Sequence, residues 1–171
     1  FDISALDPSK LHYLPCNGTK YYRMKYGKFV ANYENDMRKK IGGQNWQRLV
    51  KLLTNLQSAM SDVYNVPLTG SFINYRGSMI NWCPIGRQCT DEDRINWVKQ
   101  DKNQNIREKW ITITRDGLDN AGLQDVIIKL GGDTSFDIYP YGWDKTFAFN
   151  NFDGYKIYFV GDRCDVNGND R

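Results

Sequence analysis

The sequence has little histidine and few cysteines, and neither is arranged for metal binding. The single histidine is His12, and the four cysteines, Cys16, Cys83, Cys89 and Cys164, include no C-x-x-C pair. Zinc sites need several such side chains at short, regular spacing. This pattern disfavours a zinc site and indicates reduced cytosolic thiols.

The sequence also lacks long apolar runs and a strong charge of one sign. No stretch approaches the ~20 apolar residues of a membrane span, and residues 1–30 lack a basic segment followed by an apolar one. The formal net charge is +3, with basic and acidic residues interspersed. Nucleic acid is therefore a poor candidate partner. We predict a soluble, cytoplasmic protein that does not bind membranes.

Aromatic residues are abundant, at 14% of the chain, and short β-branched or aromatic runs recur. They predict strands at residues 10–14, 21–22 and 28–33, broken at Asn17-Gly18 and Gly27. A further strand is predicted at 155–160. These features favour a mixed fold over an all-helical one.

Residues 44–63 carry apolar side chains at intervals of three or four, which predicts an amphipathic helix packed on a core. Thr90 followed by three acidic residues predicts the start of a second helix. A third helix is expected to hold Ile106 and Trp110. Together with the strands around them, these helices predict a two-layer α+β unit.

Two hairpins are predicted in the same part of the chain. Residues 70–75 and 78–82 flank Arg76-Gly77, which places the arginine at a bend. Strands at 124–130 and 134–139 are separated by a glycine-rich turn.

Two of these segments resemble signatures of the eukaryotic-type phosphomannomutase family, in the haloacid dehalogenase superfamily. Residues 76–87 read R-G-S-M-I-N-W-C-P-I-G-R and are similar to R-x-G-M-x-N-x-x-P-I-G-R. Residues 135–145 read S-F-D-I-Y-P-Y-G-W-D-K and are similar to the very specific S-F-D-x-x-P-x-G-W-D-K. Arg94 lies between them at a matching position. The resemblance covers most of residues 70–170.

Three arginines, Arg76, Arg87 and Arg94, lie within this region. A guanidinium presents two parallel N–H donors that match two phosphate oxygens, and its charge does not titrate away. Scattered arginines are usually surface charges, but all three fall where the family binds the distal phosphate of its substrate. We expect them to converge on one concave surface.

Ser135 and Asp137 are two residues apart on a predicted strand, so both side chains point to one face while Phe136 points to the other. A solvent-facing strand edge would show the same pattern. The resemblance favours contact with the hydroxyls of a sugar.

The resemblance also implies residues of a catalytic site. Lys145 is similar to the lysine that stabilises the aspartyl nucleophile and the transferring phosphoryl group. Asp162 and Asp170 resemble the late metal-binding motif, and Mg²⁺ binds carboxylate oxygens while keeping several waters. Hexose 1,6-bisphosphate is the implied activator.

The implied architecture is an antiparallel sheet backed by helices, forming an α+β cap at residues 34–143. This cap is inserted into an incomplete, Rossmann-like α/β haloacid dehalogenase core. Residues 1–33 and 144–171 are expected to be pieces of that core, and the cap to form a homodimer.

The implied reaction interconverts mannose 6-phosphate and mannose 1-phosphate through an aspartyl-phosphate. The D-x-D-G-T segment that carries the nucleophile is absent from these 171 residues. We therefore expect a fragment of a longer enzyme, inactive by itself. Two alternatives stay open: a sugar-phosphate phosphatase of the same superfamily, and a non-catalytic sugar-phosphate-binding module.

Overall fold

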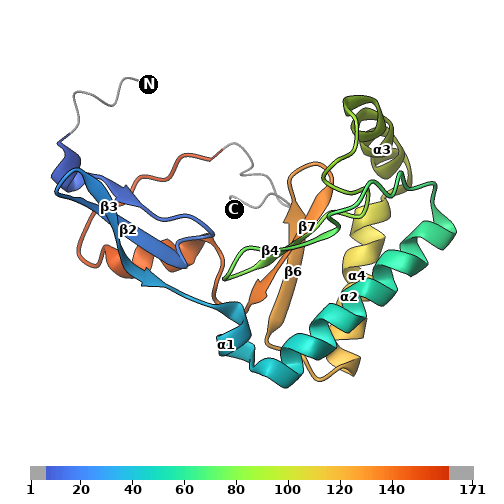
Figure 1. The fold of residues 1–171 in the computed structure, drawn as a ribbon, viewed down its shortest axis with the longest axis horizontal. Helices are drawn as coiled ribbons and strands as arrows, with labels where there is room; N and C mark the ends of the chain where they lie inside the picture. Colours follow the sequence, from blue (N-terminus) through green and yellow to red (C-terminus); the bar gives the residue numbers. More distant parts are fainter. Residues whose placement is uncertain (1–6, 162–171) are drawn as a thin grey trace.

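The computed structural model describes residues 7–161, which form two lobes (Figure 1). The smaller lobe contains a three-stranded antiparallel sheet in the order β1-β2-β3 and two short 3₁₀ helices. Its elements are η1 (Pro8–Lys10), β1 (His12–Tyr13), β2 (Lys20–Lys25), β3 (Lys28–Glu34) and η2 (Lys145–Asn151). Helix α1 (Met37–Ile41) follows β3 and leads into the larger lobe.

The larger lobe consists of a four-stranded antiparallel sheet, ordered β4-β5-β7-β6, with helices on one face (Figure 1). The strands are β4 (Ile73–Tyr75), β5 (Ile80–Trp82), β6 (Val126–Gly131) and β7 (Ser135–Pro140). The helices are α2 (Gly43–Val63), α3 (Asp91–Gln104) and α4 (Ile106–Asn120). Antiparallel sheets combined with helices confirm the predicted α+β class.

The strand register gives the larger sheet one polar and one apolar face. Asn74, Asn81, Asp137 and Lys129 lie directly opposite one another across the four strands. The neighbouring rows contain buried apolar residues, namely Ile80, Trp82, Ile128, Phe136 and Ile138. Because side chains alternate between faces along a strand, the apolar rows pack against α2 and α4 while the polar row points away from them.

Packing between α2 and the sheet forms much of the core, as the predicted apolar stripe requires. Leu49 and Leu53 of α2 are completely buried. Trp82 stacks on Phe136 with 4.8 Å between ring centroids, and its Nε1 donates to Oε1 of Gln57 at 2.7 Å. The buried indole N–H is therefore satisfied by the helix that covers it. Among residues 7–161, no helix is long and apolar enough to cross a membrane.

The two lobes meet at a small joint, formed by the turn before β2, the β4–β5 bend and η2. Thr19 Oγ1 donates to Ser78 Oγ at 2.6 Å across the joint, and within the smaller lobe the Tyr33 hydroxyl donates to the Gly18 carbonyl at 2.8 Å. Gly18 has φ +80°, and a Cβ there would lie 2.6 Å from Ala148. Only glycine fits this close approach without displacing the backbone.

The strand expected at residues 70–75 is shorter in the structure and begins at Ile73. Gly70 and Ser71 have φ values of +92° and +52°, which a β-strand does not accommodate. The remaining predicted hairpins and helices are confirmed, with their ends shifted by a few residues.

The strand predicted at residues 155–160 is wrong. Residues 156–161 have no secondary structure, and the side chains of Tyr155, Tyr158 and Val160 are 75%, 76% and 94% exposed. A strand needs a partner for its backbone groups and a core for its apolar face. Within residues 7–161 this segment has neither, so its apolar composition was misleading.

Candidate functional site

Asn81 is the centre of a polar cluster on the sheet face that points away from the helices. Its Nδ2 donates to Ser135 Oγ at 3.0 Å and to Asp137 Oδ1 at 2.7 Å. Its Oδ1 accepts a hydrogen bond from Nη2 of Arg87. The amide thus connects one arginine to two oxygen-bearing side chains of β7.

The orientation predicted for Ser135 and Asp137 is confirmed. Both contact the same amide nitrogen of Asn81, whereas Phe136 between them is completely buried on the opposite face. A hydroxyl and a carboxylate are therefore held side by side on a rigid strand. Such a pair can accept and donate hydrogen bonds to sugar hydroxyls.

A cavity of about 160 Å³, called the arginine cavity below, adjoins this cluster. Three of the predicted residues, Arg87, Arg94 and Ser135, line it. Its volume is well above the ~10–15 Å³ that one water molecule needs. The other lining residues are Cys83, Gly86, Cys89, Gly132, Asp133 and Thr134. Two guanidinium groups against the single Asp133 carboxylate leave the lining with a net positive charge, which suits an anion such as phosphate.

Arg94 reaches the cavity from the first turn of α3. Its Nη2 lies 3.8 Å from Oδ2 of Asp133, and both side chains are about half exposed. An ion pair that is this long and exposed contributes little free energy. An incoming phosphate can therefore replace the carboxylate as the partner of Arg94.

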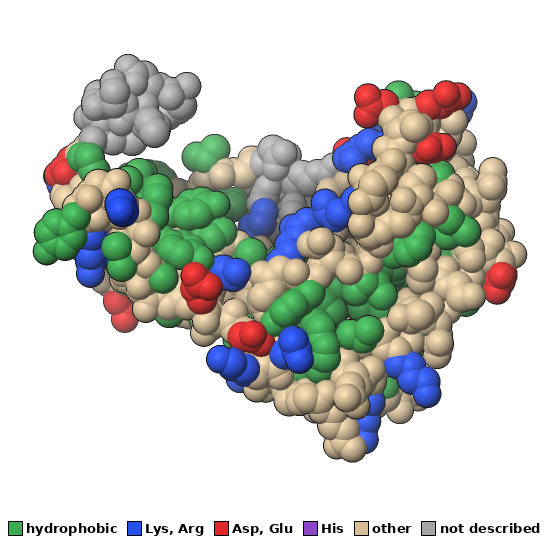
Figure 2. Space-filling model, viewed as in Figure 1, with side chains coloured by type: hydrophobic (Ala, Val, Ile, Leu, Met, Phe, Trp, Pro, Cys, Tyr) green, Lys and Arg blue, Asp and Glu red, His purple; other side chains and the backbone are tan. Residues whose placement is uncertain are grey.

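Arg76 is not among the residues that line this cavity. It lies at the bend between β4 and β5, where its backbone N–H donates to the Met79 carbonyl at 2.8 Å. The Nζ of Lys20 lies near Gly77 of the same bend. The cavity thus holds two of the three arginines, and the third lies at the lobe joint. Basic side chains occupy the hollow between the lobes (Figure 2).

Lys145 is the first residue of η2 and is half-buried at the lobe joint. Asp144 caps this helix by accepting from the Thr146 N–H at 2.9 Å. The Trp143 carbonyl accepts from Nδ2 of Asn17 at 3.1 Å. Lys145 therefore lies where the chain passes from one lobe to the other, outside the arginine cavity.

The two predicted metal ligands, Asp162 and Asp170, lie outside the described residues. Within residues 7–161, no group of three or more His, Cys, Asp or Glu side chains could hold a metal ion. The magnesium site therefore stays a prediction from the sequence.

Two titratable groups near the site are kept in their neutral forms. Burial raises the pKa of the Cys89 thiol, with a smaller contribution from Cys83. Burial, followed by the charges of Asp144 and Asp137, raises the pKa of Tyr139 to about 12. Near neutral pH both groups therefore add no negative charge that would repel an anion.

Sequence reasoning missed Asn81 and Asp133. Asn81 lies inside the first signature, but its central position depends on the strand register that sets it opposite Asp137. Asp133 lies in the β6–β7 turn, where an acidic residue is common for conformational reasons. Neither role has a signal in local sequence.

Comparisons with known proteins show the family of this chain. The family described as eukaryotic phosphomannomutase matches residues 9–171. "Phosphomannomutase 1" of Dictyostelium discoideum is 34% identical over 95% of this chain and 63% of its own length. "Phosphomannomutase" of Drosophila melanogaster is 34% identical over 77% of this chain and 55% of its own length.

A soybean (Glycine max) "Phosphomannomutase" is 41% identical over 59% of this chain and 40% of its own length. The chain thus spans between 40% and 63% of the length of these three relatives. The match of the family to nearly the whole chain includes both signatures and the residues of the arginine cavity. The chain belongs to the eukaryotic phosphomannomutase family.

Proposed function

We propose that this chain is the substrate-binding part of a phosphomannomutase, which interconverts mannose 6-phosphate and mannose 1-phosphate through an aspartyl-phosphate. One observation carries the proposal: Asn81 joins a positively charged cavity directly to a row of sugar-compatible side chains. A phosphate and a hexose ring attached to it need adjacent sites of these two kinds. Family membership supports the same reading.

In this proposal the cavity holds the phosphate that is not reacting. Arg87 and Arg94 bind its oxygens, while Ser135 and Asp137 bind ring hydroxyls. Arg76, at the lobe joint, completes the basic surface as the substrate enters. A mutase must bind a bisphosphate intermediate in two orientations, so it requires a phosphate site away from the reacting centre.

The rest of the enzyme is also part of the proposal. Residues 34–143 act as a cap inserted into a haloacid dehalogenase core, to which 1–33 and 144–171 contribute. Lys145 stabilises the nucleophilic aspartate, which other residues of the full protein supply. Mg²⁺ would bind Asp162 and Asp170 and offset phosphoryl charge. Hexose 1,6-bisphosphate is the activator, and the cap forms the homodimer.

A sugar-phosphate phosphatase is the main alternative. It transfers the phosphoryl group to water and has no requirement for a second phosphate site. The paired arginines in one cavity therefore favour the mutase.

Titration calorimetry of the 171-residue chain with mannose 1-phosphate tests the binding site. Arg94→Ala removes a charge-assisted hydrogen bond and should lower the affinity by ~10–150-fold. Arg115→Ala is the matched control, because Arg115 is exposed on α4 and is not a lining residue of the arginine cavity.

The circular dichroism spectrum and the thermal midpoint of Arg94→Ala should match those of the unmodified chain, since Arg94 is exposed. If both Arg87→Ala and Arg94→Ala bound mannose 1-phosphate with unchanged affinity, the cavity would not be the phosphate site. The phosphatase would then be the better assignment.

A further inference from the structure

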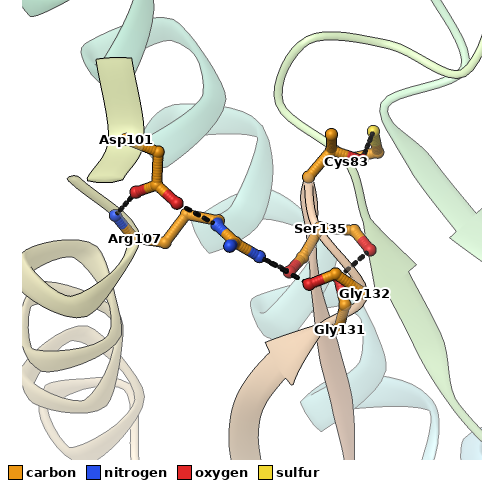
Figure 3. A network of polar contacts seen from close by, with 7 residues as sticks. Cys83, Asp101, Arg107, Gly131, Gly132 and Ser135 are labelled. Carbon is orange, nitrogen blue, oxygen red and sulfur yellow. Dashed lines mark hydrogen bonds and ion pairs between the residues drawn. The ribbon is translucent and has the colours of Figure 1, made fainter. Parts of the chain in front are cut away.

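A buried ion pair outside the proposed binding site connects two helices to the rim of the arginine cavity (Figure 3). Asp101, in the last turn of α3, is only 7% exposed. Its Oδ1 accepts from the backbone N–H of Arg107 at 2.7 Å, and its Oδ2 accepts from Nε of Arg107 at 2.7 Å. One carboxylate therefore caps the start of α4 and fixes the Arg107 side chain.

The far end of the same guanidinium reaches the β6–β7 turn. Nη1 of Arg107 donates to the carbonyl of Gly132 at 3.0 Å and to that of Ser135 at 3.3 Å. These two carbonyls bracket Asp133 and Thr134. The three turn residues Gly132 to Thr134, and Ser135 at the start of β7, line the cavity that contains Arg87 and Arg94.

The β6–β7 turn has open space beside the Cα of Gly132. A Cβ placed on Gly132 would have no atom within 4 Å. Ser135 is further held from within the strand pair, because its Oγ donates to the Gly131 carbonyl at 2.6 Å. The Arg107 guanidinium, whose donors are planar and pre-organised, holds the turn through its hydrogen bonds to the Gly132 and Ser135 carbonyls.

A buried ion pair is weak evidence for stability, since apolar residues of similar volume often stabilise a fold equally well. What such residues cannot supply is a fixed set of donors aimed at two particular carbonyls. The Asp101–Arg107 pair has this geometry, and its donors end on the rim of the cavity.

We propose that Asp101 and Arg107 are positioning residues, which hold the β6–β7 turn in the conformation that binds the substrate phosphate. The proposal rests on the proposed function of the cavity. Neither residue contacts the substrate: Arg107 acts through the Gly132 and Ser135 carbonyls, and Asp101 acts through Arg107.

Arg107→Lys is the informative variant because lysine keeps the charge opposite Asp101. Its single ammonium group cannot reach the carboxylate and both carbonyls together, so the fold should persist while the turn loosens. Arg115→Lys is the matched control, two turns further along α4 and exposed. Asp101→Asn is a second variant, in which one oxygen can still accept the Arg107 N–H.

Two measurements on the full chain separate the pair's role from that of the cavity. Hydrogen–deuterium exchange of a peptide covering residues 131–135 measures how readily the turn opens without any ligand. Calorimetry with inorganic phosphate measures the anion affinity of the cavity. For Arg107→Lys and Asp101→Asn we expect faster exchange in the turn and phosphate affinity lower by about tenfold. Arg115→Lys should change neither.

A double variant, Arg107→Lys with Arg94→Ala, gives the decisive comparison. If the pair acts through the cavity, Arg107→Lys should have little further effect on phosphate binding once Arg94 is removed. A purely structural role would lower the thermal midpoint but would leave the phosphate affinity of the folded protein unchanged.

Unchanged exchange at 131–135 would overturn the proposal whatever the calorimetry gave. Faster exchange with unaltered phosphate affinity would overturn it as well, while leaving the cavity in place. Phosphate binding by the unmodified chain that survives Arg87→Ala and Arg94→Ala would reject the proposed function itself, and the positioning role with it.

Discussion

Asn81 uses both ends of its amide, and this single side chain links the two halves of the proposed site. The nitrogen contacts Ser135 and Asp137, and the oxygen accepts from Arg87. Because an amide has both a donor nitrogen and an acceptor oxygen, it can bind a carboxylate at one end and a guanidinium at the other. Asn81 therefore fixes the position of Ser135 and Asp137 relative to the arginine cavity.

Gly131 leaves room for the Asp137 carboxylate on the neighbouring strand. A Cβ at this position would lie 2.8 Å from Asp137 Cγ. We predict that Gly131→Ala displaces the carboxylate from Asn81 and lowers mannose 1-phosphate affinity by about tenfold, comparable with the loss of a hydrogen bond to a charged group. Inorganic phosphate affinity should be unchanged, because the cavity arginines are untouched.

Calorimetry with the two ligands checks this prediction. Gly43→Ala is a suitable control, since Gly43 begins α2 and has no atom within 4 Å of an added Cβ. Equal losses for both ligands in Gly131→Ala would show that the substitution disturbs the whole site and would contradict a sugar-specific role of Asp137.

For single residues, the sequence predicted which way a side chain points better than it predicted which side chains are hydrogen-bonded to each other. The shared face of Ser135 and Asp137 follows from the two-residue period of a strand, which any correctly identified strand imposes. The contacts of Asn81 and Arg107 depend on register and on loop paths between elements distant in sequence. No local pattern contains that information.

Among the elements, α3 begins with a capping box that also determines where Arg94 lies. Thr90 Oγ1 accepts from the Asp93 N–H at 3.1 Å, and Asp93 Oδ2 accepts from the Thr90 N–H at 3.2 Å. Arg94 follows directly in the first turn. The signal for this cap, a threonine followed by three acids, was legible in the sequence.

We predict that Thr90→Ala lowers the free energy of unfolding by about 1 kcal/mol, because it leaves an N-terminal N–H of the helix without its acceptor. Thr90→Ser keeps the hydroxyl and should remain close to the unmodified chain. Urea denaturation of both variants measures the difference. If Thr90→Ser were as destabilising as Thr90→Ala, the packing of the threonine methyl group would be the cause instead.

The elements that sequence predicted well are those that carry their own signals. Helix α2 has an apolar stripe, and three of its four buried residues, Leu49, Leu53 and Met60, belong to it; the fourth is the polar Gln57. The segment at 155–160 has the composition of a strand, but composition cannot supply the neighbouring strand that it requires. Strand formation depends on partners, so it is the less predictable of the two.

At the scale of the whole molecule, the buried core belongs almost entirely to the larger lobe. The core cluster runs from Met37 to Trp143 and contains no residue of β1, β2 or β3. Tyr21 is the one buried hydrophobic residue of the smaller lobe among the residues described. The segment proposed as the cap thus contains its own core, which is the usual property of an independent domain.

We predict that residues 34–143 expressed alone fold cooperatively and bind inorganic phosphate with nearly the affinity of the 171-residue chain. All residues of the arginine cavity lie inside this segment. Differential scanning calorimetry and titration calorimetry measure the two properties. If residues 34–143 alone gave no cooperative unfolding peak while the full chain did, the proposed boundaries would be contradicted.

The lobe joint connects residues that are synthesised far apart in time. A hydrogen bond joins Asn17 to Trp143 at the joint, and another joins Tyr33 to Asn151 within the smaller lobe; these partners are 126 and 118 positions apart. Every residue of the larger lobe emerges from the ribosome between these partners. Since closing a long loop slows the formation of contacts at long sequence separation, strands β1 to β3 can complete these contacts only after the larger lobe has been synthesised. The larger lobe, which contains its own core, can therefore fold before the smaller sheet is fixed against it.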